Sequence, residues 1–321
     1  MTLDCQPADV RLFDRLDIIG DVHGCEHTLT RLLIQLGYEK QRGVFHHPER
    51  IAVFVGDIID RGPRIREALQ LVRAMVEAGS ARMILGNHEI HALCYCTPHP
   101  NAPGNYLRPH TPRNTQVIVD TLAQFAAYPD EWQDHLRWLK TLPLYLDFGA
   151  YRVVHACWDE AIISARGSAQ LSAAELSAMA DPACPEARAV KRLSSGFEVA
   201  LPEHCRMFSA EGYRRRSFRA KFWVDNPGTF ADLEFQPDAL PAEVARLPVD
   251  PALRSQLVVY DSHQPPLFVG HYWLSGKPAA VASNVVCLDY SAVRFGRLVA
   301  YRTDASGIIK PQNFAWVYVD P

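Results

Sequence analysis

The feature that most constrains the fold is a short apolar run ending in a polar block that contains glycine, and this pattern occurs three times. The apolar runs span residues 16–19, 51–55 and 83–85. The blocks after them read Gly-Asp-Val-His-Gly at 20–24, Gly-Asp-Ile-Ile-Asp-Arg-Gly at 56–62 and Gly-Asn-His-Glu at 86–89. Each run is typical of a buried strand. Because parallel strands of an open sheet end at one crevice, we expect the three blocks to meet there.

Size and composition predict one large domain. The chain has 321 residues, 48% of them hydrophobic, and a net charge of −3, which indicates neither a nucleic-acid partner nor a membrane surface. We predict a single domain over residues 1–321 with an irregular insertion or lid at about 160–256. The sequence has no long apolar stretch or signal peptide, so we expect a cytoplasmic location and no membrane partner. The eight scattered cysteines are expected to be reduced thiols.

The order of predicted elements follows from hydrophobic spacing and from glycine and proline punctuation. Strands and helices alternate through the first 90 residues, which is typical of parallel βαβ units. Helices are expected near 29–36, 65–78, 115–127 and 131–141, with a hairpin of 144–148 and 151–155. The proline-rich segment 97–113 is expected to form a surface loop near the crevice. Five later strands are expected to build a second sheet packed on the first, at 257–260, 267–270, 281–288, 298–302 and 315–319.

Six side chains at the ends of predicted strands are candidate metal ligands: Asp21, His23, Asp57, Asn87, His155 and His271. Asp21 and His23 lie two positions apart, so both can face one ion, and Asp57 is placed to bridge that ion to a second. Asn87, His155 and His271 can complete the second site, although a histidine after an apolar strand is often only a core residue. Oxygen and imidazole ligands without thiolate permit manganese, iron, zinc, cobalt or nickel and disfavour calcium.

The three polar blocks and the two later strand ends at 152–155 and 268–271 make five ordered blocks. Together they resemble the calcineurin-like metallophosphoesterase superfamily, in the branch of phosphoprotein phosphatases and dinucleoside polyphosphate hydrolases. The resemblance implies an α/β fold in four layers, an α/β/β/α sandwich with two central mixed sheets flanked by helices. It implies that Asp21, His23 and Asp57 hold a first divalent ion. It also implies that a second ion is held by four side chains, namely Asp57, Asn87, His155 and His271. By the same resemblance the two ions are expected to be Mn²⁺.

Side chains beside the predicted ions can supply the rest of a phosphoester hydrolysis. Two ions about 3.5–4 Å apart would polarise the phosphoryl oxygens and lower the pKa of a bridging water, whose hydroxide attacks in line. His88 is the candidate proton donor to the leaving oxygen. The resemblance pairs it with Asp60, whose carboxylate should favour the protonated imidazole; the alternative role of Asp60 is a helix cap. Arg61 offers a planar fork for two phosphoryl oxygens, or else a surface ion pair.

The resemblance also implies a second phosphate-binding arginine between His155 and His271. That region contains a cationic run, Arg214, Arg215, Arg216, Arg219 and Lys221. In an extended segment Arg215 and Arg219 would share one face, and we take these two as the candidates. The alternative interpretation is a solvated charged surface.

The sequence signals for the substrate conflict. Asp60 before Arg61 is similar to the phosphoprotein phosphatases, whereas Ile84-Leu85 before Gly86 and the segment 284–290 are similar to the dinucleotide hydrolases. We expect a two-metal phosphomonoesterase that acts on a phosphoprotein or a small phosphomonoester. The alternative substrate is a dinucleoside polyphosphate of the diadenosine tetraphosphate type. A third interpretation, an inactive metal-dependent binding module, would not need a proton donor or a phosphate clamp.

The chain departs from the family pattern after His155. The family usually has Ala-Gly there, and this chain has Ala156-Cys157-Trp158. This predicts a thiol and an indole close to the second ion, where they would narrow the pocket or stack on a base.

Overall fold

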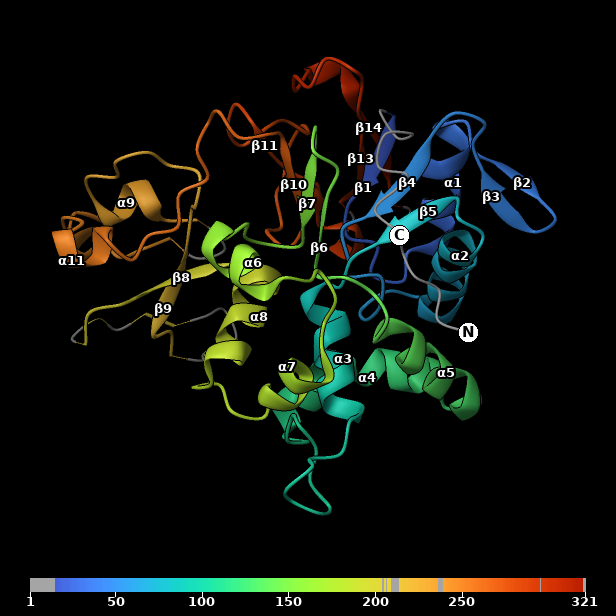
Figure 1. Ribbon diagram of the computed structural model, residues 1–321, viewed down its shortest axis with the longest axis horizontal. Helices are drawn as coiled ribbons and strands as arrows, with labels where there is room; N and C mark the ends of the chain where they lie inside the picture. The colour runs from blue at the N-terminus through green and yellow to red at the C-terminus, as the bar shows by residue number, and fades with distance from the viewer. Residues whose placement is uncertain are drawn as a thin grey trace.

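The computed structural model describes residues 15–203, 205, 207, 208, 214–235, 239–294 and 296–319 (Figure 1). Cys5 and the rest of the N-terminal segment before residue 15 lie outside them. The seven cysteines within this part of the chain are all free thiols, as expected. Among the same residues we find no helix with the length and apolar character that a bilayer crossing requires.

The first sheet has six strands. Its parallel part contains β1 (Leu16–Ile19), β4 (Ile51–Phe54) and β5 (Ala81–Met83). The first two coincide with predicted apolar runs, whereas β5 starts two residues before the run predicted at 83–85 and overlaps it only at Met83. Antiparallel strands extend it beyond β1: β13 (Arg297–Arg302), β12 (Asp289–Tyr290) and β14 (Phe314–Tyr318). The order is β12-β13-β1-β4-β5, with β14 paired to β13. The three polar blocks therefore leave the sheet at one edge.

The second sheet has four strands in the order β11-β10-β7-β6. Their bounds are Val285–Cys287, Leu267–Val269, Arg152–Val154 and Tyr145–Asp147. β11, β10 and β7 run parallel, and β6 pairs antiparallel with β7 in the predicted hairpin. The parallel direction carries His155 and His271 to the same end of this sheet, each just after its strand.

The two sheets pack face to face, because alternate residues of both contribute to one apolar core. Leu16, Ile18 and Val53 from the first sheet share this core with Phe268 and Val286 from the second, and all five are fully buried. The other face of the first sheet, with Ile19, Ala52 and Phe54, belongs to a separate core with the helices. Strands buried on both faces explain why the runs are apolar throughout rather than alternating. The four-layer α/β/β/α arrangement is confirmed.

Helices cover the outer faces of the sheets (Figure 1). Those on the side of the first sheet and around the crevice are α1 (Glu26–Gln35), α2 (Ile65–Glu77), α3 (Asn87–Cys96), α4 (Pro112–Phe125) and α5 (Pro129–Leu139). Those beside the second sheet are α6 (Glu160–Arg166), α7 (Ala173–Ala178) and α8 (Pro185–Ser195). A two-residue turn at Arg42 and Gly43, both at positive φ, also joins an unpredicted polar hairpin of β2 (Glu39–Gln41) and β3 (Val44–His46).

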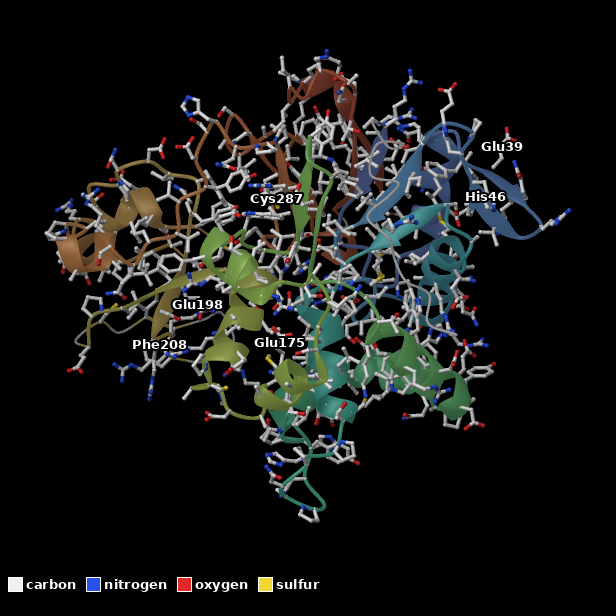
Figure 2. All side chains as sticks on the ribbon, in the orientation of Figure 1. Glu39, His46, Glu175, Glu198, Phe208 and Cys287 are labelled. Atoms are coloured by element: carbon white, nitrogen blue, oxygen red, sulfur yellow. The ribbon has the colours of Figure 1, made fainter. Side chains whose placement is uncertain are left out.

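Helices α6, α7 and α8 already belong to the segment predicted as an insertion or lid, and they lie beside the second sheet. The later part of that segment projects to one side of the molecule (Figure 1). It contains a hairpin of β8 (Phe197–Ala200) and β9 (Ser217–Ala220), then three four-residue helices: α9 (Phe230–Leu233), α10 (Ala242–Ala245) and α11 (Pro251–Arg254). Phe208, labelled in Figure 2, lies on this segment with 54% of its surface exposed.

Three predictions about the fold were wrong. The runs at 298–302 and 315–319 belong to the first sheet, because β13 pairs with the otherwise open edge of β1. Residues 257–260 form no strand. The proline-rich loop after α3 also lies away from the crevice, because α3 starts at Asn87 and its ten residues carry the chain about 15 Å along the helix axis before the loop begins. Figure 1 shows the tip of this loop at the far end of α3.

Candidate metal centre

The predicted ligand blocks converge on Asp57, at the end of β4. Its Oδ2 atom lies 3.7 Å from His23 Nε2, 3.9 Å from His88 Nε2 and 3.3 Å from His155 Nε2. All four side chains are nearly or fully buried. A buried carboxylate facing three imidazole nitrogens across gaps of this size is an arrangement that a cation can occupy.

Two groups of donors share Asp57. Ligand atoms of His23, Asp57 and His88 lie within 4.8 Å of one another, and so do those of Asp57, His155 and His271. Asn87 joins the second group, since its Oδ1 lies 3.1 Å from His155 Nε2 and 2.7 Å from His271 Nδ1. The shared position of Asp57 matches the bridging role that the sequence predicts for it.

Backbone carbonyls fix the imidazole rings in the orientation that ligands need. Nδ1 of His23 lies 2.8 Å from the carbonyl oxygen of Ile59, and Nδ1 of His155 lies 2.7 Å from that of Val55. Each Nδ1–H donates to its carbonyl, so in the neutral ring each Nε2 presents a lone pair toward Asp57. Three acceptor atoms, one each from Asp57, Asn87 and His155, then meet without a proton between them, and a divalent cation would satisfy all three.

The electrostatics agree with this fit. Burial alone would lower the pKa of His155, but the nearby carboxylates, first Asp57, outweigh it and raise that pKa to about 10. Burial would raise the pKa of Asp57, and the surrounding histidines, first His155, hold it well below its usual range. Burial lowers the pKa of His271 well below normal. Without a metal the site therefore attracts a proton to His155, so a cation binding there must displace that proton.

Asp21 lies beside the two groups without being part of either. Its carboxylate accepts a hydrogen bond of 3.1 Å from the backbone amide of His271, and it is buried. Burial, together with the negative charge of Asp289, raises its pKa well above normal. The structure thus places Asp21 next to the predicted second group, whereas the resemblance assigns it to the first ion. Its assignment as a ligand remains a proposal.

Glu89 organises the turn that carries the bridging aspartate, a role that the sequence reasoning missed. Its buried carboxylate accepts from the backbone amides of Asp57 and Ile58, both at 2.8 Å, and of Gly86 at 3.0 Å. Burial raises the pKa of Glu89 to about 7. The signal was present in the sequence, since a glutamate three residues into a helix often bonds back to the turn before it.

The glycines of the blocks are required because the strand ends approach so closely. A Cβ atom on Gly56, which has φ +98°, would lie 2.4 Å from the backbone nitrogen of Gly86. A Cβ on Gly86 would lie 2.1 Å from Oδ1 of Asp57. Any side chain at these positions would push apart the two turns that form the centre.

We predict that Gly56→Ala destabilises the metal-free protein by about 2–5 kcal/mol, since the cost of a left-handed alanine adds to that of overpacking. Gly43→Ala is the matched control, because Gly43 has φ +88° with nothing within 4 Å of its added Cβ. It should lose only about 1–2 kcal/mol. Urea unfolding of both variants measures the difference, and equal losses would contradict the close-packing explanation.

Backbone strain is concentrated at this centre. Nine described residues other than glycine have positive φ, and six of them surround the site: His23, Asp57, Asp60, Arg61, His271 and Trp273. Such conformations cost about 1–3 kcal/mol each and persist where surrounding contacts impose them. The concentration of strain is typical of a functional site.

His88 pairs with Asp60, as the resemblance implies, and it also contacts Arg61, which the sequence did not predict. Its Nδ1 is 2.6 Å from Asp60 Oδ2, and its Nε2 is 3.0 Å from Arg61 Nη2. The hydroxyl of Thr121 donates a hydrogen bond to the other oxygen of Asp60. This carboxylate is fully buried, and it does not cap a helix. Arg61 also reaches His23 Nε2 at 3.3 Å, so its guanidinium fork spans both imidazoles.

We expected the imidazole of His88 to be protonated, and in the metal-free chain this prediction was wrong. Burial lowers its pKa to about 4; Asp57 opposes this shift, and the positive charge of Arg61 adds to it. An arginine donates to Nε2, so that atom carries a lone pair, and the Nδ1–H donates to Asp60. Burial meanwhile raises the pKa of Asp60 to about 7, so the pair takes up its extra proton below about pH 7.

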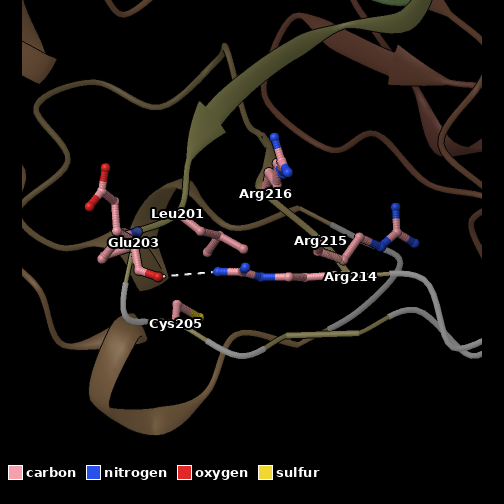
Figure 3. Close-up of a pocket in the computed structure, with 7 residues that line it drawn as sticks. Leu201, Glu203, Cys205, Arg214, Arg215 and Arg216 are labelled. Atoms are coloured by element: carbon pink, nitrogen blue, oxygen red, sulfur yellow. Dashed lines mark hydrogen bonds between the residues drawn. The ribbon is translucent and has the colours of Figure 1, made fainter.

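The two candidate arginines of the insertion lie in different places. Arg219, on β9, is half-buried, and its positive charge lowers the pKa of His271, so its guanidinium lies within electrostatic range of the second group. Arg215 instead lines a cavity of about 410 Å³ together with Arg214 and Arg216 (Figure 3). In that cavity Arg214 donates to the carbonyl oxygen of Glu203 at 3.2 Å. Of the two, Arg219 is the one the structure brings toward the centre.

The indole that reaches the centre belongs to Trp273, and the prediction for Trp158 was wrong. Trp158 is 2% exposed, packs edge-on against Tyr145 and donates from Nε1 to Glu160. Trp273 instead lies under Arg61, whose Cζ atom is 4.9 Å from the centroid of the indole ring. The sequence gives only a weak signal for this, since Trp273 lies two residues past a candidate ligand in a loop.

Known proteins that resemble this chain fall in the class that the fold and the site suggest. Residues 15–163 match the family model described as calcineurin-like phosphoesterase. Over these residues the chain is similar to the calcineurin-like phosphoesterases, and the matched range contains every candidate ligand except His271.

Curated relatives are similar to parts of the chain. The asymmetrical bis(5'-nucleosyl)-tetraphosphatase PrpE of Geobacillus sp. is 33% identical over 153 residues, 44% of this chain and 57% of the relative. That of Halalkalibacterium halodurans is 49% identical over 75 residues, 23% of this chain and 30% of the relative. The symmetrical bis(5'-nucleosyl)-tetraphosphatase of Aromatoleum aromaticum is 33% identical over 138 residues, 43% of this chain and 42% of the relative. The chain thus spans about half or less of the length of the curated relatives it matches.

Solved structures match over most of the chain at low identity. A cold-active protein tyrosine phosphatase covers 92% of this chain and 77% of its own, with 19% identity and a TM-score of 0.48. A protein serine/threonine phosphatase from Saccharomyces cerevisiae covers 96% of this chain and 80% of its own, with 12% identity and a TM-score of 0.45. At these values the matches add nothing to a functional assignment.

Proposed function

We propose that this chain hydrolyses phosphoesters with two divalent metal ions held around Asp57. The observation that carries the proposal is the position of Asp57, whose carboxylate is shared by two groups of buried imidazoles. The first ion would bind to His23 and Asp57, with Asp21 as the further ligand that the resemblance implies, and the second to Asp57, Asn87, His155 and His271. When bound, the ions neutralise the phosphoryl oxygens and make water a better nucleophile. We propose manganese, with iron, zinc, cobalt and nickel as alternatives.

Arg61 is proposed to bind the phosphoryl group. Its fork lies across His23 and His88, at the mouth of the first donor group. A phosphate is a stronger acceptor than a neutral imidazole, so the guanidinium would move onto two phosphoryl oxygens when substrate enters. This movement releases Nε2 of His88. Arg219, on the side of the second group, is proposed as a further phosphate contact, ahead of Arg215, which lines a separate cavity.

His88 is proposed to protonate the leaving oxygen from Nε2. Once Arg61 has turned to the phosphate, a neighbouring anion replaces a neighbouring cation, and this raises the pKa of the imidazole. Asp60 stays on Nδ1 and holds the ring in place. An inactive binding module would have no use for a buried imidazole and carboxylate pair beside an arginine.

A dinucleoside polyphosphate is our proposed substrate, in preference to the phosphomonoester that the sequence reasoning placed first. The names of the relatives support it, as do Ile84-Leu85 before Gly86 and the segment 284–290. Asp60 before Arg61 does not oppose it, since some dinucleotide hydrolases also have this pair.

The test compares four substrates with the metal-loaded protein: diadenosine tetraphosphate, p-nitrophenyl phosphate, its bis-ester and a phosphopeptide. We expect diadenosine tetraphosphate to be turned over fastest and a chelator to abolish turnover, with readdition of Mn²⁺ restoring it. Chromatography of the products distinguishes cleavage at the centre of the tetraphosphate from cleavage nearer one end. Fast turnover of the phosphopeptide alone would favour the phosphatase interpretation instead. Tight metal binding without turnover of any of the four substrates would support a binding module.

A further inference from the structure

A second cavity adjoins the metal centre, in the loops after β10 and β12. Its volume is about 320 Å³, and its walls include three aromatic side chains and one cation: Trp273, Tyr290, Tyr318 and Arg297. Arg297 lies against the ring of Tyr318 at 4.8 Å and donates to its hydroxyl at 3.1 Å. Among the described residues that line this cavity, none is acidic.

Trp273 connects this cavity to the metal centre. It also lines a smaller hollow with His23, Arg61 and Asp289, and Ser291 borders both spaces. Trp273 therefore bounds the larger cavity and also lies under Arg61, the arginine proposed to bind phosphate. A molecule with a phosphate on Arg61 can thus extend past Trp273 into the aromatic cavity.

Asp289 holds the two walls of this passage in place. Its carboxylate accepts from the backbone amide of Trp273 at 3.0 Å and from that of Ser291 at 2.9 Å. Both of these residues have positive φ, +48° and +56°. Its carbonyl oxygen also accepts from the amide of Leu274 at 2.8 Å. A buried carboxylate imposing two strained positions indicates that the passage has a fixed shape, as a binding site requires.

We propose that this aromatic cavity binds one nucleobase of the substrate. Aromatic rings stack on bases, and an arginine together with a tyrosine hydroxyl can bond the nitrogen and oxygen atoms at a base edge. The volume lies at the small end of ligand pockets, which suits one nucleoside rather than a larger group. Arg297 and Tyr318, which bond each other, can also bond the polar edge of a base, whereas a plain phenyl ring offers them no such partner. The proposal rests on the proposed function for the substrate class, and it adds the site and the residues that recognise the base.

The test uses two ligands that differ only in the base, AMP and ribose 5-phosphate, titrated calorimetrically into the metal-loaded protein. We expect the wild type to bind AMP at least 10-fold more tightly than ribose 5-phosphate. Trp273→Leu should remove most of that preference, and Tyr318→Ala should reduce it about 5-fold. Tyr128→Ala is the matched control, because Tyr128 is also an exposed tyrosine that contacts an arginine. The Cζ atom of Arg66 lies 3.6 Å from the centroid of the Tyr128 ring. It should keep the full preference.

Each outcome decides the proposal. Equal binding of the two ligands by the wild type would overturn it, whether or not dinucleotides are hydrolysed. Equal weakening of both ligands in Trp273→Leu, with no change in Tyr318→Ala, would also overturn it, because the indole would then act only through Arg61. A base preference that both variants lose supports the subsite even if diadenosine tetraphosphate is not turned over, and in that case only the proposed substrate fails.

Discussion

Replacing Asp57 with asparagine is expected to lower the affinity for divalent metal by at least about 100-fold and to abolish turnover. Substitution of groups that only support a ligand costs about 10- to 100-fold in metal affinity, so loss of a charged ligand shared by two ions should cost more. The fold should survive, because asparagine has nearly the same shape and its Oδ1 can still accept the 3.0 Å bond from the amide of His88.

The metal-free variant offers an independent readout. Asp57 is the first of the groups that raise the pKa of His155 to about 10 against the effect of burial. Without its charge, burial dominates, and the pKa of His155 should fall toward or below its ordinary value of about 6.5. Titration of the imidazole signals by NMR follows this directly. The wild-type ring should stay protonated up to about pH 10, while the variant ring should lose its proton several units earlier.

Asp159→Asn is the matched control for the Asp57 variant. Asp159 is nearly buried as well, but its partner is Arg192 rather than a histidine, and asparagine can still cap α6. Its metal affinity and the His155 titration should not change. If Asp57→Asn bound metal as tightly as this control, the bridging role of Asp57 would have to be abandoned.

The crevice could be predicted from sequence because each part of the argument is local. An apolar run followed by glycine and a polar side chain specifies a strand end, and parallel strands place their ends together. Asp57 and His155 thus came within 3.3 Å of each other from blocks nearly 100 residues apart. The glycines mattered for the same reason, since Gly56 and Gly86 face each other where the turns meet.

What the sequence could not settle depends on partners chosen at long range. A strand such as β13 is apolar whichever sheet it joins, and only the open edge of β1 decides where it pairs. Trp158 and Trp273 each follow a candidate ligand closely, yet one enters the core and the other reaches Arg61. The difference arises from backbone turns with positive φ at His271 and Trp273, which hydrophobic spacing does not encode.

Replacing His88 with asparagine is expected to reduce kcat by about 10²- to 10⁴-fold while leaving metal binding nearly intact. The ring of His88 is already engaged by Asp60 and Arg61, and the first group keeps His23 and Asp57 without it. The loss should be largest for substrates with a poor leaving group and smallest for p-nitrophenyl phosphate, whose leaving oxygen needs little protonation. Because His88 Nε2 is also 3.9 Å from Asp57, metal titration is the deciding measurement. A metal loss as large as that of Asp57→Asn would make His88 a ligand rather than a proton donor.

The pH profile provides the second check on this role. Burial raises the pKa of Asp60 to about 7 in the metal-free protein, so the His88–Asp60 pair gains its extra proton below that pH and loses it above. If this proton goes to the leaving oxygen, kcat/KM should fall about tenfold per pH unit on the alkaline side. Bound cations favour the carboxylate and shift that decline to lower pH. Asp60→Asn removes the titrating carboxyl and should remove this limb of the profile together with much of the rate, whereas an unchanged limb in that variant would assign the proton to another group.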